Sequence, residues 1–279
     1  MAEPLVLDGF WNEIEPLIPK HPPDPRGGAP RRPDRACLEG ILHVLRTGTQ
    51  WKQLPQCELW PSGSTCWRRF TEWTQVGVWP QLHRRLLNIL GMAGEINLDH
   101  AVVDSASVRA KKGGDHTGPS PVDRAKRGCK RHVITDAGGL PLLMQCTPAN
   151  VRDDSPFLEM LDSMPPVKHP GPGRPRYKPR AIVGDAAYGF DHLVAQVVDR
   201  RMASLLAPRG KPGQPATHGS GLGRVRYVVE RTIAWLANFR RIVQCYERTG
   251  SAWQAFNEIA CCVICANRLH KIALARMAA

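Results

Sequence analysis

The chain has 279 residues, enough for one large domain or for a large and a small domain with an ample core. Its 38 Lys and Arg against 25 Asp and Glu give a formal net charge of +13, which suits a nucleic-acid partner. No apolar run is long enough to span a membrane, and no basic-then-apolar signal opens the chain, so we expect a soluble, cytoplasmic protein without a membrane partner.

The first 94 residues predict a small all-α domain. We expect Asp34 to cap the second of its helices, Gly48 to end it, and Ser64 to cap the third. A basic, Pro/Gly-rich arm over 21–35 separates the first two helices. Apolar spacing of three and four predicts the helices over 7–18, 35–46, a stretch around Trp67 and 78–90.

Paired arginines give this helical part a possible DNA-binding face. A helix, a short turn and a helix carrying Arg68 and Arg69 are compatible with helix-turn-helix binding. A plain helical bundle with solvated arginines explains the pattern equally well. On the fourth helix we expect Trp79 to face inward and His83 to face outward. We therefore predict a helical N-terminal DNA-binding domain over 1–94 and keep the bundle as the alternative.

Residues 95–279 have a mixed α/β pattern. Two β-prone runs end in an acid, Asp104 and Asp185, and a hairpin is expected around Gly138-Gly139. The expected strands cover 100–104, 130–136, 140–147, 180–185 and 203–207. The expected helices cover 155–161, 190–201, 224–241 and 253–274, with Gly-rich or Pro-rich loops over 163–179 and 209–223.

This order matches a ribonuclease-H-like mixed sheet, in which three antiparallel strands are followed by parallel strands joined by helices. The first and fourth strands of such a sheet are neighbours, so Asp104 and Asp185 would lie side by side and Glu230 could close over them from the following helix. The predicted fold class is therefore α/β, with a ribonuclease-H-like sheet flanked by helices over 95–279, preceded by the all-α domain.

Each of these acids also has a plainer explanation. Arg226 lies four residues before Glu230, so the two could form an ordinary surface pair, and strand-end aspartates are often turn residues. Three carboxylates held together, however, repel unless divalent cations lie between them. Oxygen ligands select Mg²⁺ or Mn²⁺, and two such ions about 4 Å apart serve in-line phosphoryl transfer. The sequence thus points to metal-dependent chemistry on DNA.

At these residues the chain resembles the DDE-type transposases of bacterial insertion sequences, in the group around insertion sequence five. The resemblance runs through nearly the whole chain and rests on an ordered set of short motifs. They include Arg68-Arg69-Phe70, Val103-Asp104-Ser105, Lys130-Arg131-His132, Gly184-Asp185-Ala186-Ala187-Tyr188, Arg226-Tyr227-Val228-Val229-Glu230-Arg231 and Phe239-Arg240-Arg241.

The resemblance implies that Asp104, Asp185 and Glu230 form the catalytic, metal-binding triad of a transposase that cleaves element ends and transfers their 3′-hydroxyls to target DNA. It implies double-stranded DNA as the partner, and because two ends must pair we expect a dimer on DNA. The wider signature has Tyr and Lys where this chain has Gly223 and Ala237. The expected DNA-binding residues are Arg68, Arg69, Lys130, Arg131, His132, Arg226, Arg231, Arg240 and Arg241.

Two other functions remain open, a ribonuclease-H-like nuclease that does not transpose and an inactive DNA-binding repressor. A zinc site is a further possibility at Cys261, Cys262 and Cys265, with His270 beyond them. These cysteines lie in an apolar helical stretch without a second Cys pair at finger spacing, so buried core thiols are expected instead. The odd total of nine cysteines likewise favours reduced thiols.

Overall fold

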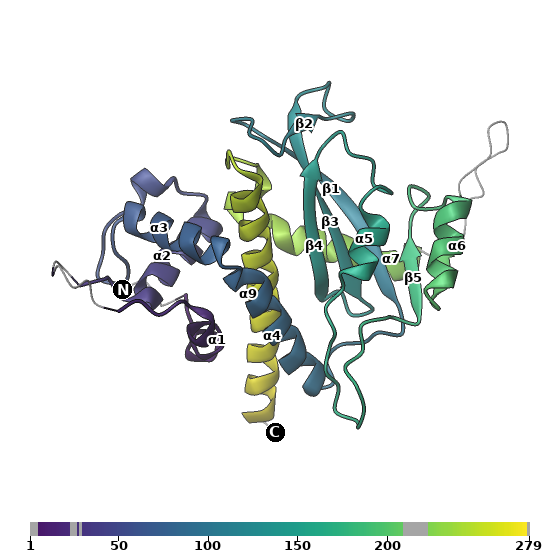
Figure 1. Cartoon of the computed structure of the whole chain (residues 1–279), viewed down its shortest axis with the longest axis horizontal. Coiled ribbons are helices and arrows are strands. Elements are labelled where there is room, and N and C mark those ends of the chain that lie inside the picture. Colours follow the sequence, from purple (N-terminus) through teal and green to yellow (C-terminus); the bar gives the residue numbers. More distant parts are fainter. Residues whose placement is uncertain (1–4, 23–26, 28–29, 209–222, 278–279) are drawn as a thin grey trace.

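The computed structural model describes residues 5–22, 27, 30–208 and 223–277, so the loop expected over 209–223 lies outside them apart from Gly223. Helices gather at the N-terminal side and a mixed sheet at the other, with a long helix between them (Figure 1). The helices are α1 (Asp8–Ile14), α2 (Asp34–Thr47), α3 (Gly63–Gln75), α4 (Val78–Met92), α5 (Phe157–Asp162), α6 (Asp191–Asp199), α7 (Gly223–Ala237), α8 (Arg240–Val243) and α9 (Gly250–Met277). The strands are β1 (Ala101–Arg109), β2 (Gly118–Pro119), β3 (Arg127–Asp136), β4 (Pro141–Pro148), β5 (Ala181–Gly184) and β6 (Ala203–Leu206).

The sheet has six strands, with β1 near its middle. On one side β1 pairs antiparallel with β3, which in turn pairs with β4 through the expected hairpin. On the other side β1 pairs parallel with β5, and β5 pairs parallel with β6. The predicted neighbourhood of the two acid-bearing strands is therefore confirmed.

Two elements differ from the sequence prediction near the acids. The first strand does not end at Asp104 but continues to Arg109, because β3 remains paired with it over that length. The helix expected over 224–241 breaks after Ala237, and buried Phe239, in an extended conformation, precedes the short helix α8. Arg240 and Arg241 consequently lie on α8 and not on the helix of Glu230.

Helix ends and one helix face in the N-terminal part also need correction. Ser62, not Ser64, caps α3 by accepting a hydrogen bond from the Thr65 backbone amide. Asp34 lies in the first turn of α2 and accepts a hydrogen bond from Arg69 instead of capping the helix. His83 points inward, where its ring nitrogen Nε2 lies 2.9 Å from the Pro141 carbonyl oxygen. Gly48 does end α2, at φ 74°, as expected.

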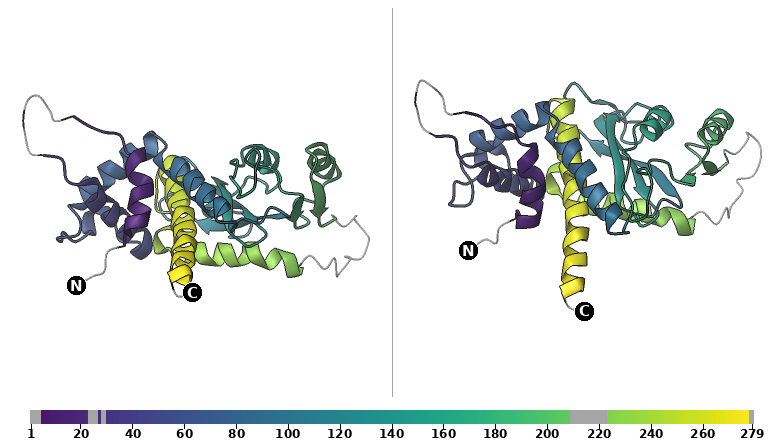
Figure 2. Two further views of the ribbon diagram at one scale, coloured as in Figure 1. Left: turned by 90° about the horizontal axis from the view of Figure 1, so that it is seen from below. Right: turned by 60° about the horizontal axis from the view of Figure 1, so that its bottom comes forward.

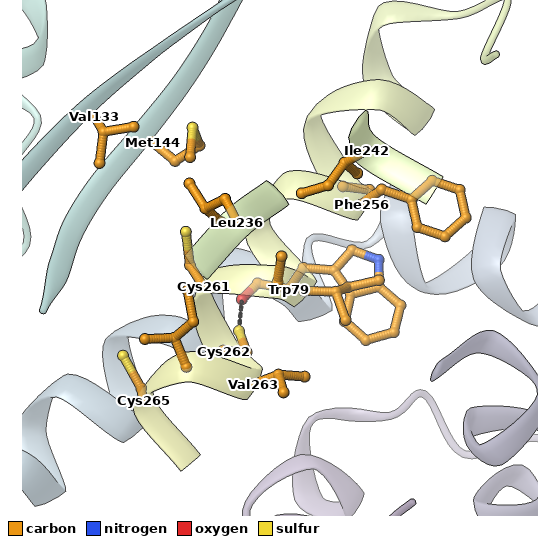
Figure 3. Close-up of a cluster of buried hydrophobic side chains, with 14 of the residues drawn as sticks. Trp79, Val133, Met144, Leu236, Ile242, Phe256, Cys261, Cys262, Val263 and Cys265 are labelled. Carbon is orange, nitrogen blue, oxygen red and sulfur yellow. Dashed lines mark hydrogen bonds between the residues drawn. The ribbon is translucent and has the colours of Figure 1, made fainter. Parts of the chain in front are cut away.

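Helix α9 joins the two parts of the chain, packing against α4 on one side and β4 on the other (Figure 1). Cys261, Cys262 and Cys265 are fully buried in this junction, with Cys261 directed toward Val133 and Met144 of the sheet (Figure 3). All nine cysteines are free, and the described residues contain no group of three or more His, Cys, Asp or Glu suited to a metal. The prediction of core thiols at these positions is confirmed.

Two layers of helices enclose the sheet, which places α7 over the acid-bearing strands. Helix α7 covers one face, where it contacts β1, β3 and β5, and α5 lies over the other (Figure 2). Val228, Val229, Thr232 and Leu236 are the buried side chains of α7. Because they recur at helical spacing, they hold one side of α7 on the sheet and leave the opposite side exposed.

Candidate active site

The sheet register places Asp104 and Asp185 opposite each other. Val102 of β1 pairs with Val183 of β5, and each aspartate lies two residues further along its own strand direction. Strand β5 ends at Gly184, whereas β1 continues with β3 as its partner, so the sheet forks at this point. A fork at the carboxyl end of parallel strands is where open α/β sheets bind ligands.

Arg226 connects the two aspartates from α7. Its Nη2 lies 3.7 Å from Asp104 Oδ2 and 3.8 Å from Asp185 Oδ2, and the arginine side chain is only one-quarter exposed. Its Nε is buried and has no hydrogen-bond partner among the described residues. A single guanidinium therefore offsets the repulsion between two carboxylates that the sheet holds face to face.

Backbone amides fix the direction of both carboxylates. The Ser105 amide donates to Asp104 Oδ1 at 2.7 Å, and the Ala187 amide donates to Asp185 Oδ1 at 2.9 Å. Burial raises the pKa of Asp104 to about 6, with the charges of Asp185 and Glu230 adding to the shift and Arg226 opposing it. Asp104 is thus a carboxylate whose ionised form needs a cation.

Glu230 lies close enough for its charge to act on Asp104, yet its position differs from that of the aspartates. It is exposed, one turn after Arg226 on α7, and the fold does not gather it with Asp104 and Asp185 into a ready three-carboxylate cluster within the described residues. The structure therefore brings Asp104 and Asp185 together and leaves Glu230 exposed on α7.

A polar network lies next to Asp104 in the chain and joins Ser105 of β1, Lys130 of β3 and Asp153. Ser105 Oγ donates to Asp153 Oδ1 at 2.5 Å, and Lys130 Nζ lies 3.0 Å from the same carboxylate oxygen while donating to the Val151 carbonyl. Tyr188 is 1% exposed and lies inside the fold next to Asp185. Burial, followed by the charges of Asp153, Asp104 and Asp185, raises the pKa of Tyr188.

Five of the nine expected DNA-binding side chains are buried, which removes them from direct contact with DNA in this conformation. Arg69 Nε contacts Asp34 at 2.7 Å and Arg241 Nε contacts Glu247 at 2.8 Å, so both hold helices in place. The other three, Lys130, Arg131 and His132, lie on β3 inside the fold. Such burial depends on tertiary pairing and leaves no trace in the local sequence.

The β3 residues have separate structural roles. His132 is fully buried beside Thr147, and burial lowers its pKa to about 4, so its ring is neutral at pH 7 and does not serve as a cationic phosphate contact. Arg131 points away from Lys130 and His132, and burial lowers its pKa as well. The motif that suggested phosphate binding therefore belongs to the interior of the sheet.

Four cations of the expected set remain available. Arg68 and Arg240 are exposed, and Arg226 and Arg231 are half-buried. Arg231 stacks between the rings of Tyr227 and Trp235, at 5.4 and 4.8 Å from their centroids, and donates to the Gly138 carbonyl. The sequence carries no signal for the role of Asp153, because its partners Ser105 and Lys130 lie far from it in the chain.

Two carboxylates held together can bind a divalent cation, which serves phosphoryl transfer, and the comparisons with known proteins agree with such chemistry. Residues 97–265 match the family model described as "Transposase DDE domain", and residues 6–83 match "Putative transposase of IS4/5 family". The first match covers more than half of the chain. The chain therefore belongs to the DDE-domain transposases.

Curated relatives support the same family. The "Putative transposase for insertion sequence element IS402" of Burkholderia cepacia is 41% identical over 155 residues, which cover 56% of this chain and 71% of that protein. The "Insertion element IS402 uncharacterized 16.2 kDa protein" of the same organism is 46% identical over 126 residues, covering 43% and 84%. The "Putative transposase for insertion sequence element IS6501" of Brucella ovis is 28% identical over 136 residues, covering 48% and 95%.

No solved structure matches the chain significantly. None of the helices in the described part of the chain has the length and apolarity needed to cross a membrane.

Proposed function

We propose that Asp104, Asp185 and Glu230 are the catalytic carboxylates of this transposase, in a ribonuclease-H-like domain over 95–279. The observation that carries the proposal is the parallel pairing of β1 and β5, which sets two carboxylates opposite each other under a guanidinium. The strand arrangement also supports the ribonuclease-H-like assignment, since the hairpin β3–β4 lies on one side of β1 and the parallel strands β5 and β6 on the other.

The donor set fits the divalent cation that the DDE family implies. Mg²⁺ prefers carboxylate oxygens, keeps several waters, and is commonly held by one or two carboxylates together with substrate phosphate. Asp104 and Asp185 supply two such groups from adjacent strands, and Glu230 would join when the helix or the DNA brings it inward. When bound, Mg²⁺ or Mn²⁺, proposed as two ions, would activate the attacking oxygen and neutralise the leaving one.

The protein's own residues would then orient the reacting strand. Exposed Arg68 and Arg240 and half-buried Arg226 and Arg231 would hold phosphates by charge-assisted hydrogen bonds. Arg226 would leave the two aspartates as cations enter and take up a phosphate instead. The overall chemistry is cleavage of a phosphodiester bond by water, which frees a 3′-hydroxyl, followed by attack of that hydroxyl on a target phosphate.

The N-terminal helices are proposed as the part that binds the ends of the element, with a boundary near residue 94. Arg68 is exposed on α3 beside Trp67, which is 48% exposed, and such a basic and aromatic surface suits DNA. Because two ends must be joined together, we propose that the protein acts as a dimer on DNA.

The test uses labelled duplexes carrying the DNA that flanks the gene, with Mg²⁺, Ca²⁺ or EDTA. Mg²⁺-dependent nicking at the end, followed by joining to a second duplex, is expected of the intact protein. Asp185→Asn should bind the same duplex and cut none of it, whereas Asp99→Asn, an exposed acid just before β1, should cut normally. Nicking without joining would indicate a nuclease, and equal cutting by the Asp185 variant would refute the assignment.

A further inference from the structure

A basic hollow lies on the other side of α7 from the paired aspartates. It has a volume of about 760 Å³ and is bounded by the end of α2, the hairpin between β3 and β4, the C-terminal half of α7 and the second half of α9. Figure 2 shows the C-terminal end of α7 meeting α9 at this place. Four segments distant in sequence thus form one surface.

The charges in this hollow do not cancel. Its lining includes Arg46, Arg231, Arg268 and Lys271 against a single acid, Glu95, which leaves three positive charges. Glu95 is already paired with Arg268, 2.9 Å from its Nε. Arg46 and Lys271 are exposed and have no partner among the residues that the structure describes. The uncompensated cations therefore face solvent from both walls.

Arg231 lines the hollow and has a fixed orientation. The rings of Tyr227 and Trp235 enclose its guanidinium, its Nη2 donates to the Gly138 carbonyl at 2.5 Å, and its buried Nε has no described partner. An arginine fixed in this way loses little side-chain entropy when it binds an anion. Asn238 and Asn267 add neutral hydrogen-bonding groups to the same lining.

The exposed side of α7 connects this hollow with the catalytic edge. Between Glu230 and Asn238 the exposed residues are Ala234 and Ala237, whose small side chains allow a close approach. Glu230 is the only acid on α7, and it lies five residues before Trp235, about 8 Å along the helix axis. A polyanion crossing α7 would therefore meet the acids on one side and the basic hollow on the other.

We propose that this hollow between α7 and α9 binds the phosphate backbone of duplex DNA as it crosses α7 to reach the carboxylates. The inference rests on the proposed function and adds a site with residues of α2 and α9, in particular Arg46 and Lys271. An acidic protein segment is the competing occupant. DNA is favoured because the cations lie on separate walls with amide side chains between them, as expected for a surface that binds successive phosphates of a DNA strand.

The test is the charge-reversal variant Arg46→Glu/Lys271→Glu. Binding to two labelled duplexes, one with an element end and one of unrelated sequence, is measured by fluorescence anisotropy in EDTA over 50 to 200 mM salt. We expect about tenfold weaker binding and a salt slope of log K lower by about 2, because each phosphate contact contributes about 0.9 to that slope. Arg46→Gln/Lys271→Gln should show a smaller loss in the same direction.

The matched control is Lys168→Glu/Lys178→Glu, which reverses two exposed cations that lie outside the proposed N-terminal DNA-binding domain and do not line the hollow. All variants should unfold at the temperature of the intact protein. Weaker binding of the variant to only one of the two duplexes would support the site and identify which DNA it holds. Equal loss in variant and control, or a changed oligomeric state with unchanged DNA affinity, would overturn the inference while leaving the catalytic assignment intact. Absence of DNA binding by the intact protein would overturn both.

Discussion

Replacing Asp104 by Asn should stabilise the metal-free protein while abolishing DNA cleavage. The carboxyl is held between two strands with a side chain 17% exposed, and its pKa is raised to about 6, chiefly by burial. Asn keeps the oxygen that accepts the Ser105 amide hydrogen bond and removes the charge. The proposed catalytic acid is therefore expected to cost stability, as active-site groups often do.

The magnitude follows from proton linkage. An unfolded aspartate has a pKa of about 3.9, so folding raises the value by about two pH units, and each unit corresponds to about 1.4 kcal/mol. Between pH 4 and 6 the folded state binds more protons than the unfolded state. The stability contributed by the protonated form is therefore complete below about pH 4 and is lost as pH rises to about 6. Above pH 6 the ionised carboxyl costs about 3 kcal/mol.

Urea unfolding in EDTA at pH 5, 6, 7 and 8 measures this effect. The difference between Asp104→Asn and the intact protein should grow with pH and level off near 3 kcal/mol above pH 7. Asp99→Asn is the matched control, because Asp99 is exposed and its one ion pair among the described residues is with exposed Arg180, so its removal should change little. Excess Mg²⁺ should narrow the difference, because the cation favours the ionised acid.

The reasoning is refuted if Asp104→Asn is no more stable than the intact protein at pH 8 in EDTA. A stabilised variant that still cleaves DNA would show that the charge of Asp104 lowers stability but is not needed for cleavage.

Three further predictions concern other charges and one close contact. Arg226→Gln should lower the unfolding temperature in EDTA at pH 8 and much less in Mg²⁺, because the arginine bridges Asp104 and Asp185; an equal loss in both buffers would contradict this. Burial raises the pKa of Glu258 to about 7. Glu258→Gln should therefore add about 3 kcal/mol to the free energy of unfolding at pH 8 and nothing at pH 4, as measured by urea unfolding. Gly91→Ala would place a methyl group 2.0 Å from the Lys168 carbonyl oxygen and should cost about 1–3 kcal/mol; an unchanged urea midpoint would exclude this contact.

Much of the fold could be predicted because it depends on local spacing. The apolar positions of α7 recur every three or four residues, and Gly138-Gly139 marks the turn between β3 and β4. Strand and helix order then restricted the sheet to few arrangements, which correctly made β1 and β5 neighbours. The placement of Asp104 beside Asp185 followed from that neighbourhood.

Tertiary structure decided which charged residues are accessible to DNA and which are paired inside the fold. Lys130, Arg131 and His132 form a basic run in the sequence, yet alternation along β3 and coverage on both faces bury all three. Arg46 and Lys271 are ordinary surface cations in the sequence, and only the packing of α2 against α8 and of α9 against α7 and α8 brings them to one hollow. Asp153 likewise acquires its partners through long-range contacts.

The sequence by itself thus determined the net positive charge, the helices with their apolar faces, and the strands that carry the acids, because these depend on residue type and short-range spacing. The tertiary structure alone decided that Arg226 bridges the aspartates, that Glu230 stays exposed on α7, and that basic residues divide into buried and exposed sets. Burial and charge pairing depend on contacts between residues far apart in the chain, and no local pattern encodes them.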